Sequence, residues 1–248
     1  MLVDTHCHIH DATYPLDVSE VLLHANDSNV EKMICVGTDE QSSLAAIELA
    51  EKNDHIYAAI GVHPHDTRDG YAQLNNMTSA KIVAVGEIGL DYFYEHSPRD
   101  IQIAALKAQI ELAIARDLPI IFHVRDAFDD FWPIFDSFGP IIKGVLHSFT
   151  DSHENMTAAI ARGLYIGVNG ISTFTKDVAQ QEMFALIPLE NLLLETDAPF
   201  LTPSPLRGKV NEPAFVRLVA EHHARIRGLS LDVVATQTSV NAHALFAL

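Results

Sequence analysis

The chain has 248 residues, of which 48% are hydrophobic. This length and composition supply a large buried core and exclude an intrinsically disordered chain. The 33 acidic and 16 basic residues give a net charge of −17, so the surface repels polyanions at long range. A phosphate-bearing substrate therefore requires a local positive group, and a bound divalent cation would supply one.

The N-terminus carries neither a basic segment nor an apolar leader, and no apolar run approaches the ~20 residues needed to span a bilayer. These features predict a soluble, cytoplasmic protein that makes no membrane contact. No segment indicates an obligate protein partner.

Short apolar runs alternate with helical patterns along the chain. Eight runs are predicted as strands, at residues 2–6, 32–37, 56–61, 81–89, 118–124, 142–149, 164–170 and 191–197. Their near-continuous apolar character is typical of strands buried on both faces, as in a parallel sheet. The segments between them predict helices, most clearly at 100–116, 213–227 and 230–247.

Eight strand–helix units in about 250 residues predict an α/β fold, a (β/α)8 TIM barrel, with residues 1–248 forming a single domain. The competing architecture is a doubly wound open sheet. That fold usually has fewer strands and a glycine-rich first turn. The first turn here is HCHIHD, which favours the barrel.

Polar side chains follow the predicted strands where each one ends. The C-terminal ends of barrel strands share one mouth, where active sites are built, so distant residues can converge there. His6 and His8 also alternate along one strand and therefore point the same way. The side chains concerned are His6, His8, His63, Glu87, His123, His147, Glu195 and Asp197.

Four of these histidines with Glu87 and Asp197 form a ligand set without thiolates. Imidazoles and carboxylates suit Zn, Mn and similar ions, and they accommodate Mg when water and substrate complete the coordination. Six ligands are more than one four-coordinate ion can bind, but they fit two divalent ions (Mg, Mn or Zn) that share a bridging carboxylate. We expect the remaining histidines at the surface; they are His10, His24, His55, His65, His96, His153, His222, His223 and His243.

Several motifs resemble those of the TatD-type metal-dependent deoxyribonucleases, within the amidohydrolase-like barrels. The opening DTHCH resembles a D-x-H-x-H motif that many metallohydrolases share. GEIGLDY (86–92), LETDAP (194–199) and RGKVNEP (207–213) are similar to more specific family blocks, and GVHP (61–64) and LHSF (146–149) follow the family order. The resemblance runs from residue 3 to the C-terminus.

The resemblance implies hydrolysis of DNA phosphodiester bonds, by trimming from the 3′ end in the family's manner. It places His6, His8, Glu87 and Asp197 around one metal, and Glu87, His123 and His147 around the other. Net charge of −17 favours single-stranded ends or short oligonucleotides as substrates over long duplex.

A mechanism follows from this arrangement. The metals lower the pKa of a bound water. Glu87 bridges them, and Asp197 accepts the proton as general base. Glu195 either shares that role or orients a ligand.

For substrate contacts, His63 is expected at the scissile phosphate. Arg207, Lys209 and Asn211 are expected to clamp a neighbouring phosphate. Asp91 is expected to cap the loop that follows it. The aromatic residues at 92–94 either stack on a base or pack at the barrel mouth.

Two other functions are compatible with the same motifs. The first is hydrolysis of small amides, lactones or phosphotriesters on the same two-metal barrel. Many such relatives carry a carboxylated lysine on the fourth strand, where this chain has Glu87. The second is a metal-binding or partner-binding barrel without activity, which the intact ligand set disfavours.

Overall fold

One sheet of eight parallel strands organises the computed structural model, which describes residues 1–248, and the strands pair in chain order from β1 to β8. They are β1 (Leu2–Cys7), β2 (Val30–Val36), β3 (Ile56–Ile60), β4 (Ile82–Asp91), β5 (Ile120–Arg125), β6 (Gly144–Leu146), β7 (Tyr165–Val168) and β8 (Leu192–Leu194). This sequential order confirms the (β/α)8 barrel and excludes the doubly wound sheet, whose strand order reverses at a switch point.

The barrel closes where the chain beyond β8 meets β1. Cys7 forms a parallel bridge with Ala198, and the His8 amide donates to the Ala198 carbonyl at 2.7 Å. The Thr5 hydroxyl also donates to the Leu194 carbonyl at 3.0 Å. The last strand therefore joins the first through the segment that carries Asp197.

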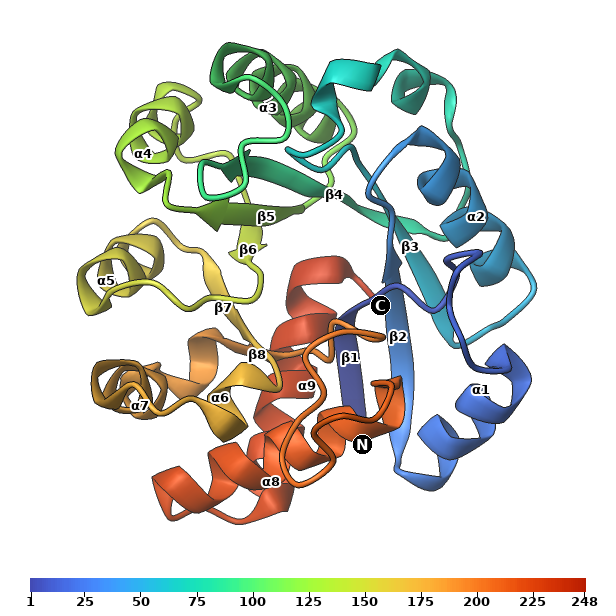
Figure 1. Ribbon diagram of the computed structural model, residues 1–248, viewed down its shortest axis with the longest axis vertical. Coiled ribbons are helices and arrows are strands. Elements are labelled where there is room, and N and C mark those ends of the chain that lie inside the picture. The colour runs from blue at the N-terminus through green and yellow to red at the C-terminus, as the bar shows by residue number, and fades with distance from the viewer.

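Helices surround the strands in Figure 1, as expected for a barrel with its parallel strands covered on the outside. They are α1 (Val18–Asp27), α2 (Glu40–Glu51), α3 (Arg99–Ala115), α4 (Phe128–Ser137), α5 (His153–Ala161), α6 (Ile171–Phe174), α7 (Val178–Leu186), α8 (Val216–Arg227) and α9 (Leu231–Phe246). Short 3-10 turns lie at Thr67–Asp69, Ala72–Asn76, Leu189–Asn191 and Pro213–Phe215. No helix has both the length and the apolar character needed to cross a bilayer.

Helix α8 shows how the sequence determines one of these elements. Its buried positions recur at helical spacing, and the helix ends at Gly228, whose φ of 64° is the left-handed conformation that glycine adopts without a Cβ clash. His223 lies on the buried stripe and is fully buried, so the expectation of a surface histidine there is wrong. Its Nε2 lies 3.1 Å from the Ser172 hydroxyl, and its Nδ1 accepts from Arg227 at 2.7 Å.

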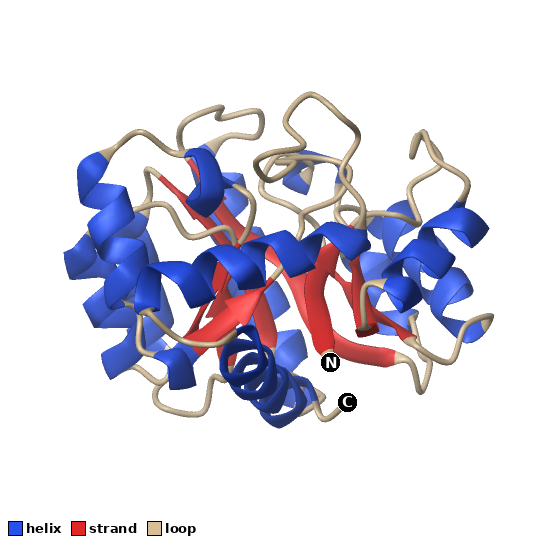
Figure 2. Ribbon diagram, turned by 90° about the horizontal axis from the view of Figure 1, so that it is seen from below, coloured by secondary structure: helices blue, strands red, loops and turns tan.

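The apolar side chains form two layers because strand residues alternate between the two faces of the sheet. Along β2, Met33 and Cys35 join the larger cluster between strands and helices, while Ile34 and Val36 face the barrel interior. The interior cluster also contains Leu245 and Phe246 of α9, so this helix closes one end of the barrel. Figure 2 shows both termini on one side of the barrel and long loops on the opposite side.

The interior layer leads directly to the candidate site. Ile121, Val145 and Leu193 belong to the interior cluster. Two residues further along each chain segment come His123, His147 and Glu195, which therefore point to the same side. The polar cluster thus lies above the apolar filling of the barrel, at the C-terminal ends of the strands.

Candidate metal centre

His6 and His8 converge at the end of β1, as their alternate spacing predicts. Their Nε2 atoms lie 3.1 Å apart, and both side chains are buried. The Nδ1 of His8 lies 2.8 Å from the Val36 carbonyl, which makes it the donor and leaves the Nε2 lone pair free. His8 is therefore held in the tautomer that a metal ligand requires.

Glu87 lies between two groups of imidazoles. Its Oε2 is 3.3 Å from the Nε2 of His6, on the β1 side. Its Oε1 is 2.8 Å from the Nδ1 of His123 and 2.9 Å from the Nε2 of His147. Each carboxylate oxygen thus faces a different set of nitrogen ligands.

Asp197 reaches the His6–His8 side from the segment that closes the barrel. Its amide donates to the His6 carbonyl at 2.8 Å, and its φ is 60°, a left-handed conformation that aspartate tolerates better than most residues. The Oδ1 lies 3.3 Å from the Nε2 of His8 and 3.7 Å from that of His6. The predicted ligands His6, His8, Glu87, His123, His147 and Asp197 therefore all meet in one cluster.

Glu195 lies beside His147 and does not line the cavity described below. Its Oε1 is 3.3 Å from the Nδ1 of His147 and accepts the Ser148 amide at 2.6 Å. Asn169 also donates to this oxygen, at 3.3 Å. Gly167 leaves room for the carboxylate, because a Cβ there would lie 2.5 Å from Oε2. Of the two roles considered for Glu195, this geometry favours orientation of a ligand.

Electrostatics in the cluster reflect burial opposed by close partners. Burial raises the pKa of the Glu87 carboxyl, but His147, His63 and His123 outweigh it and bring the pKa well below its usual range. Burial lowers the pKa of His147, yet Glu87 and Glu195 more than compensate and raise it well above the usual value. Burial, followed by the charge of His123, lowers the pKa of His63 well below its usual value. Glu87 is therefore an anion and His63 is neutral at neutral pH.

The cluster fits divalent cations by its own chemistry. Nitrogen and oxygen donors face one another at close range, and the two Nε2 atoms of His6 and His8 cannot both direct lone pairs across 3.1 Å without a positive charge between them. The buried Nδ1 of His6 has no hydrogen-bond partner, and the Nδ1 of His147 faces only the Glu195 carboxylate at 3.3 Å, so neither ring is committed to a purely structural network. Imidazole and carboxylate donors without thiolates suit Mn, Zn and related ions.

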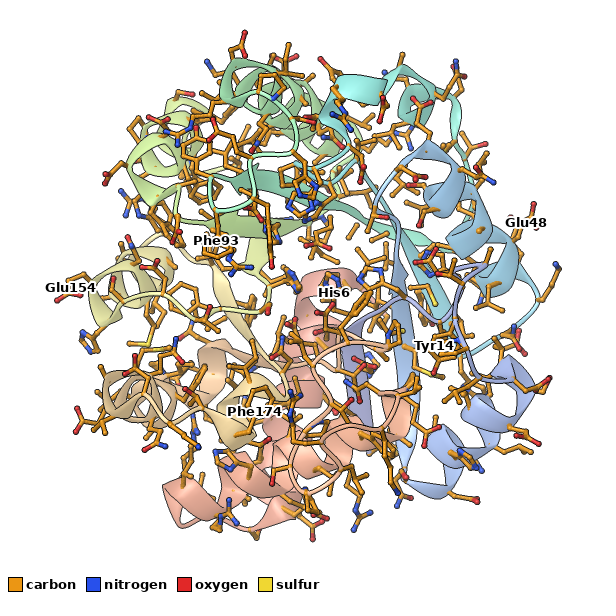
Figure 3. The ribbon with its side chains drawn as sticks, viewed as in Figure 1. His6, Tyr14, Glu48, Phe93, Glu154 and Phe174 are labelled. Atoms are coloured by element: carbon orange, nitrogen blue, oxygen red, sulfur yellow. The ribbon has the colours of Figure 1, made fainter.

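A cavity of about 720 Å³ opens above the cluster, within the range of ligand sites. Figure 3 shows His6 near the centre of the barrel and Phe93 toward the β5 side. The lining comprises His8, Asp11, Thr38, His63, His65, Asp66, Glu87, Tyr94, His123, Val124, Arg125, His147, Ser148, Thr150, Ile171, Asp197, Phe200 and Leu201.

His63 enters this cavity from the loop after β3. Its Nε2 is 3.5 Å from the Oε1 of Glu87. Its Nδ1 accepts the His65 amide at 3.2 Å, so the ring proton is on Nε2, which faces the cluster.

The predicted phosphate clamp does not lie at this cavity. Asn211 is fully buried, and its amide donates to the carbonyls of Thr196 and Phe200, so it fixes the Asp197 segment and cannot contact substrate. Arg207 is exposed, donates to the Thr202 carbonyl at 2.8 Å and stacks 3.9 Å from the centroid of Phe174. Lys209 is also exposed, and neither cation lines the cavity.

Sequence reasoning missed the contact of Asp91 with His123 and the place of Arg125 at the cavity, because β4 and β5 extend beyond their predicted ends and pair there. The Oδ2 of Asp91 lies 3.0 Å from the Nε2 atoms of both His123 and His65. Its Oδ1 accepts the amides of residues 93 and 94, which confirms the predicted loop cap. Strand alternation was the available signal: Asp91 and Arg125 follow Glu87 and His123 by even steps.

Four further histidines differ from the expected surface placement, because His10, His65, His222 and His243 are each half-buried. His65 is half-buried in the cavity wall, held by Asp91 as described above. His10 is also half-buried, with its Nε2 3.0 Å from the Ser42 hydroxyl, because the chain beyond β1 turns back against α2 instead of into solvent.

The model of one protein family, described as TatD related DNase, matches residues 3–247. The chain belongs to the TatD related DNase family. It is 40% identical to the uncharacterized metal-dependent hydrolase YabD of Bacillus subtilis, over 99% of both chains. It is 34% identical to the 3′-5′ ssDNA/RNA exonuclease TatD of Salmonella typhimurium, over 99% of this chain and 98% of that protein.

A solved structure supports the same family assignment. YJJV, a TatD homologue from Escherichia coli, superimposes with a TM-score of 0.91 at 30% identity, over 100% of this chain and 98% of that one. The TatD-family chain described here is accordingly a metal-dependent hydrolase that acts on ester bonds.

Proposed function

We propose that the protein is a 3′-5′ exonuclease that hydrolyses phosphodiester bonds at single-stranded ends or in short oligonucleotides with two divalent cations. His6, His8 and Asp197 would hold one cation, and His123 and His147 the other, with Glu87 shared by both. When bound, the cations supply Lewis acidity and lower the pKa of an attacking water.

One observation carries the proposal, namely the position of Glu87 between two ligand groups. Its Oε2 faces His6 at 3.3 Å, while its Oε1 lies within 2.9 Å of His123 and His147. A carboxylate that bound a single ion would not need a separate group of histidine nitrogens beside each of its two oxygens. The low pKa that these neighbours give Glu87 keeps it charged for this role.

Asp197 is the general base in this proposal. Its carboxylate lines the cavity and is 14% exposed, whereas Glu195 is 1% exposed and engaged with His147. Asp197 accepts the proton of the attacking water, and the neutral His63 donates a hydrogen bond from its Nε2–H to a phosphate oxygen. Glu195 and Asp91 act as positioning residues, because each holds the second nitrogen of a proposed ligand.

The preference for ends and short fragments follows from the charge and the cavity. The chain has a net charge of −17, and four carboxylates line the cavity, so a long duplex meets repulsion over most of its length. A single strand end needs only the local cations. The direction of trimming is drawn from the named activity of the Salmonella typhimurium relative.

The test uses a 5′-labelled single-stranded DNA oligonucleotide, with an RNA oligonucleotide of the same sequence in parallel. We expect Mg²⁺ or Mn²⁺ to support a ladder that shortens from the 3′ end, and Glu87→Ala to abolish it. Internal cuts would contradict the exonuclease mode. No cleavage with any metal, together with turnover of small esters or lactones, would overturn the nuclease assignment in favour of a small-molecule hydrolase.

A further inference from the structure

Arg125 is the one permanently charged cation that lines the cavity. The carboxylates of Asp11, Asp66, Glu87 and Asp197 line the same space. A substrate phosphate that is not neutralised by a metal would meet only negative side chains there, apart from this guanidinium. The question is whether Arg125 is placed and free to bind such a group.

The backbone of Arg125 is fixed by strand pairing. It is the last residue of β5, where it is in register with Asp91 of β4, and its carbonyl accepts the Tyr92 amide at 2.9 Å. It follows His123 by two positions, so its side chain leaves the strand on the same side as that proposed ligand. The residue therefore combines a rigid anchor with a position beside the metal centre.

Two aromatic rings hold the guanidinium of Arg125. Its central carbon lies 3.9 Å from the ring centroid of Phe93 and 4.9 Å from that of Tyr94. Both rings are more than half exposed, at 55% and 51%, and Tyr94 also lines the cavity. Cation–π contacts orient a guanidinium by its face and leave its N–H edges available.

The donors of Arg125 are unused. Every other arginine of the chain donates at least one hydrogen bond from its guanidinium, to a carbonyl, a carboxylate or an imidazole. The Arg125 guanidinium has neither a hydrogen bond nor an ion pair, although acidic residues are abundant in the chain. A planar cation that is stacked in place with five free donors is suited to two oxygens of one phosphate.

We propose that Arg125 binds a non-scissile phosphate of the substrate, next to the one held at the metal centre. This inference rests on the proposed nuclease function and deepens it. Arg125, which lines the cavity, would then make the phosphate contact that the sequence predicted for Arg207, Lys209 and Asn211. The Phe93–Tyr94 pair then serves to hold the cation that contacts the phosphate.

The test compares Arg125→Gln and Arg125→Lys with the competing assignment, Arg207→Gln, and with Lys107→Gln. Lys107 is exposed on α3 and its side chain has no hydrogen bond or ion pair, so Lys107→Gln is a control for the loss of one positive charge. Cleavage of a 5′-labelled oligonucleotide gives KM and kcat. Anisotropy of a fluorescein-labelled oligo(dT) with chelator-treated protein at low salt gives an affinity that does not require catalysis.

We expect Arg125→Gln to raise KM and Kd roughly 10- to 100-fold with little change in kcat, as for loss of a charged hydrogen-bonded contact. The slope of log Kd against log salt should fall by about 0.7, the value for one phosphate on a single strand. Arg125→Lys keeps the charge but loses the planar fork, and should be intermediate. Lys107→Gln should match the parent.

Unchanged KM and salt slope in Arg125→Gln, with a raised KM in Arg207→Gln, would overturn the inference. A parent protein that binds the oligonucleotide through Arg125 but cleaves nothing would refute the proposed function while supporting the phosphate contact. A parent that neither binds nor cleaves would overturn both.

Discussion

Replacing Glu195 with glutamine separates a positioning role from a role as base. The variant keeps the size of a side chain that is 1% exposed and removes the charge 3.3 Å from the Nδ1 of His147. Loss of such a partner typically weakens metal affinity 10- to 100-fold, which corresponds to about 1.4–2.7 kcal/mol. We therefore expect the Mn²⁺ concentration for half-maximal activity to rise by that factor, and kcat at saturating Mn²⁺ to recover.

The assay is hydrolysis of a 5′-labelled oligonucleotide across a Mn²⁺ titration, paired with calorimetric binding of Mn²⁺ alone. Glu190→Gln is the matched control, because Glu190 is exposed and its side chain has no hydrogen bond or ion pair. If Glu195 were the general base, kcat would fall by about 10²- to 10⁴-fold at every Mn²⁺ concentration. That result, with unchanged Mn²⁺ affinity, would refute the reasoning from the His147 contact.

Three further predictions concern stability. Burial and the charge of Arg227 hold the pKa of His223 well below its usual value, so only the unfolded chain takes up this proton as the pH falls below about 6.5. Below that pH, His223 should lower the parent's free energy of unfolding by about 1.4 kcal/mol per pH unit. In urea unfolding, the difference in free energy between the parent and His223→Gln should therefore narrow from pH 8 to pH 5. A difference that stays constant with pH would contradict this prediction. Phe246→Ala should cost about 3–5 kcal/mol by opening the end of the barrel, whereas Val240→Ala, at a side chain that is 55% exposed, should change the unfolding free energy little. Mn²⁺ at 100 times its Kd should add about 2.7 kcal/mol to the free energy of unfolding and raise Tm. Chelation should reverse this gain and abolish hydrolysis. An unchanged Tm would argue against a metal site in this cluster.

The ligand cluster was predictable because it depends on two simple regularities. Side chains alternate in direction along a strand, so His6 and His8 point the same way. The strands of a barrel end at a common mouth, so His147 lies close to Glu87. Neither regularity requires knowledge of side-chain packing. The pairing of Asp197 with β1 follows once the barrel closes.

The contacts at the cavity rim were less predictable because they depend on how far pairing continues. β4 was expected to end at residue 89, but its ladder with β5 runs on to Asp91 and Arg125. Asn211 was assigned from a motif, and a motif does not reveal that the amide satisfies two buried carbonyls. For His223 the signal was present, since it shares its helix face with Val219 and Ala220.

The closure of the barrel by α9 has a consequence for synthesis of the protein. Val3 of the first strand and Phe246 of the last helix belong to one interior cluster, although more than 240 residues separate them in the chain. While the polypeptide emerges from the ribosome, the early strands are complete long before their inner side chains can be covered. Contacts of such sequence separation form late and leave apolar surface exposed in the meantime. We therefore expect nascent chains shorter than residue 246 to be protease-sensitive and to depend on chaperones, with protection acquired only once α9 has left the exit tunnel.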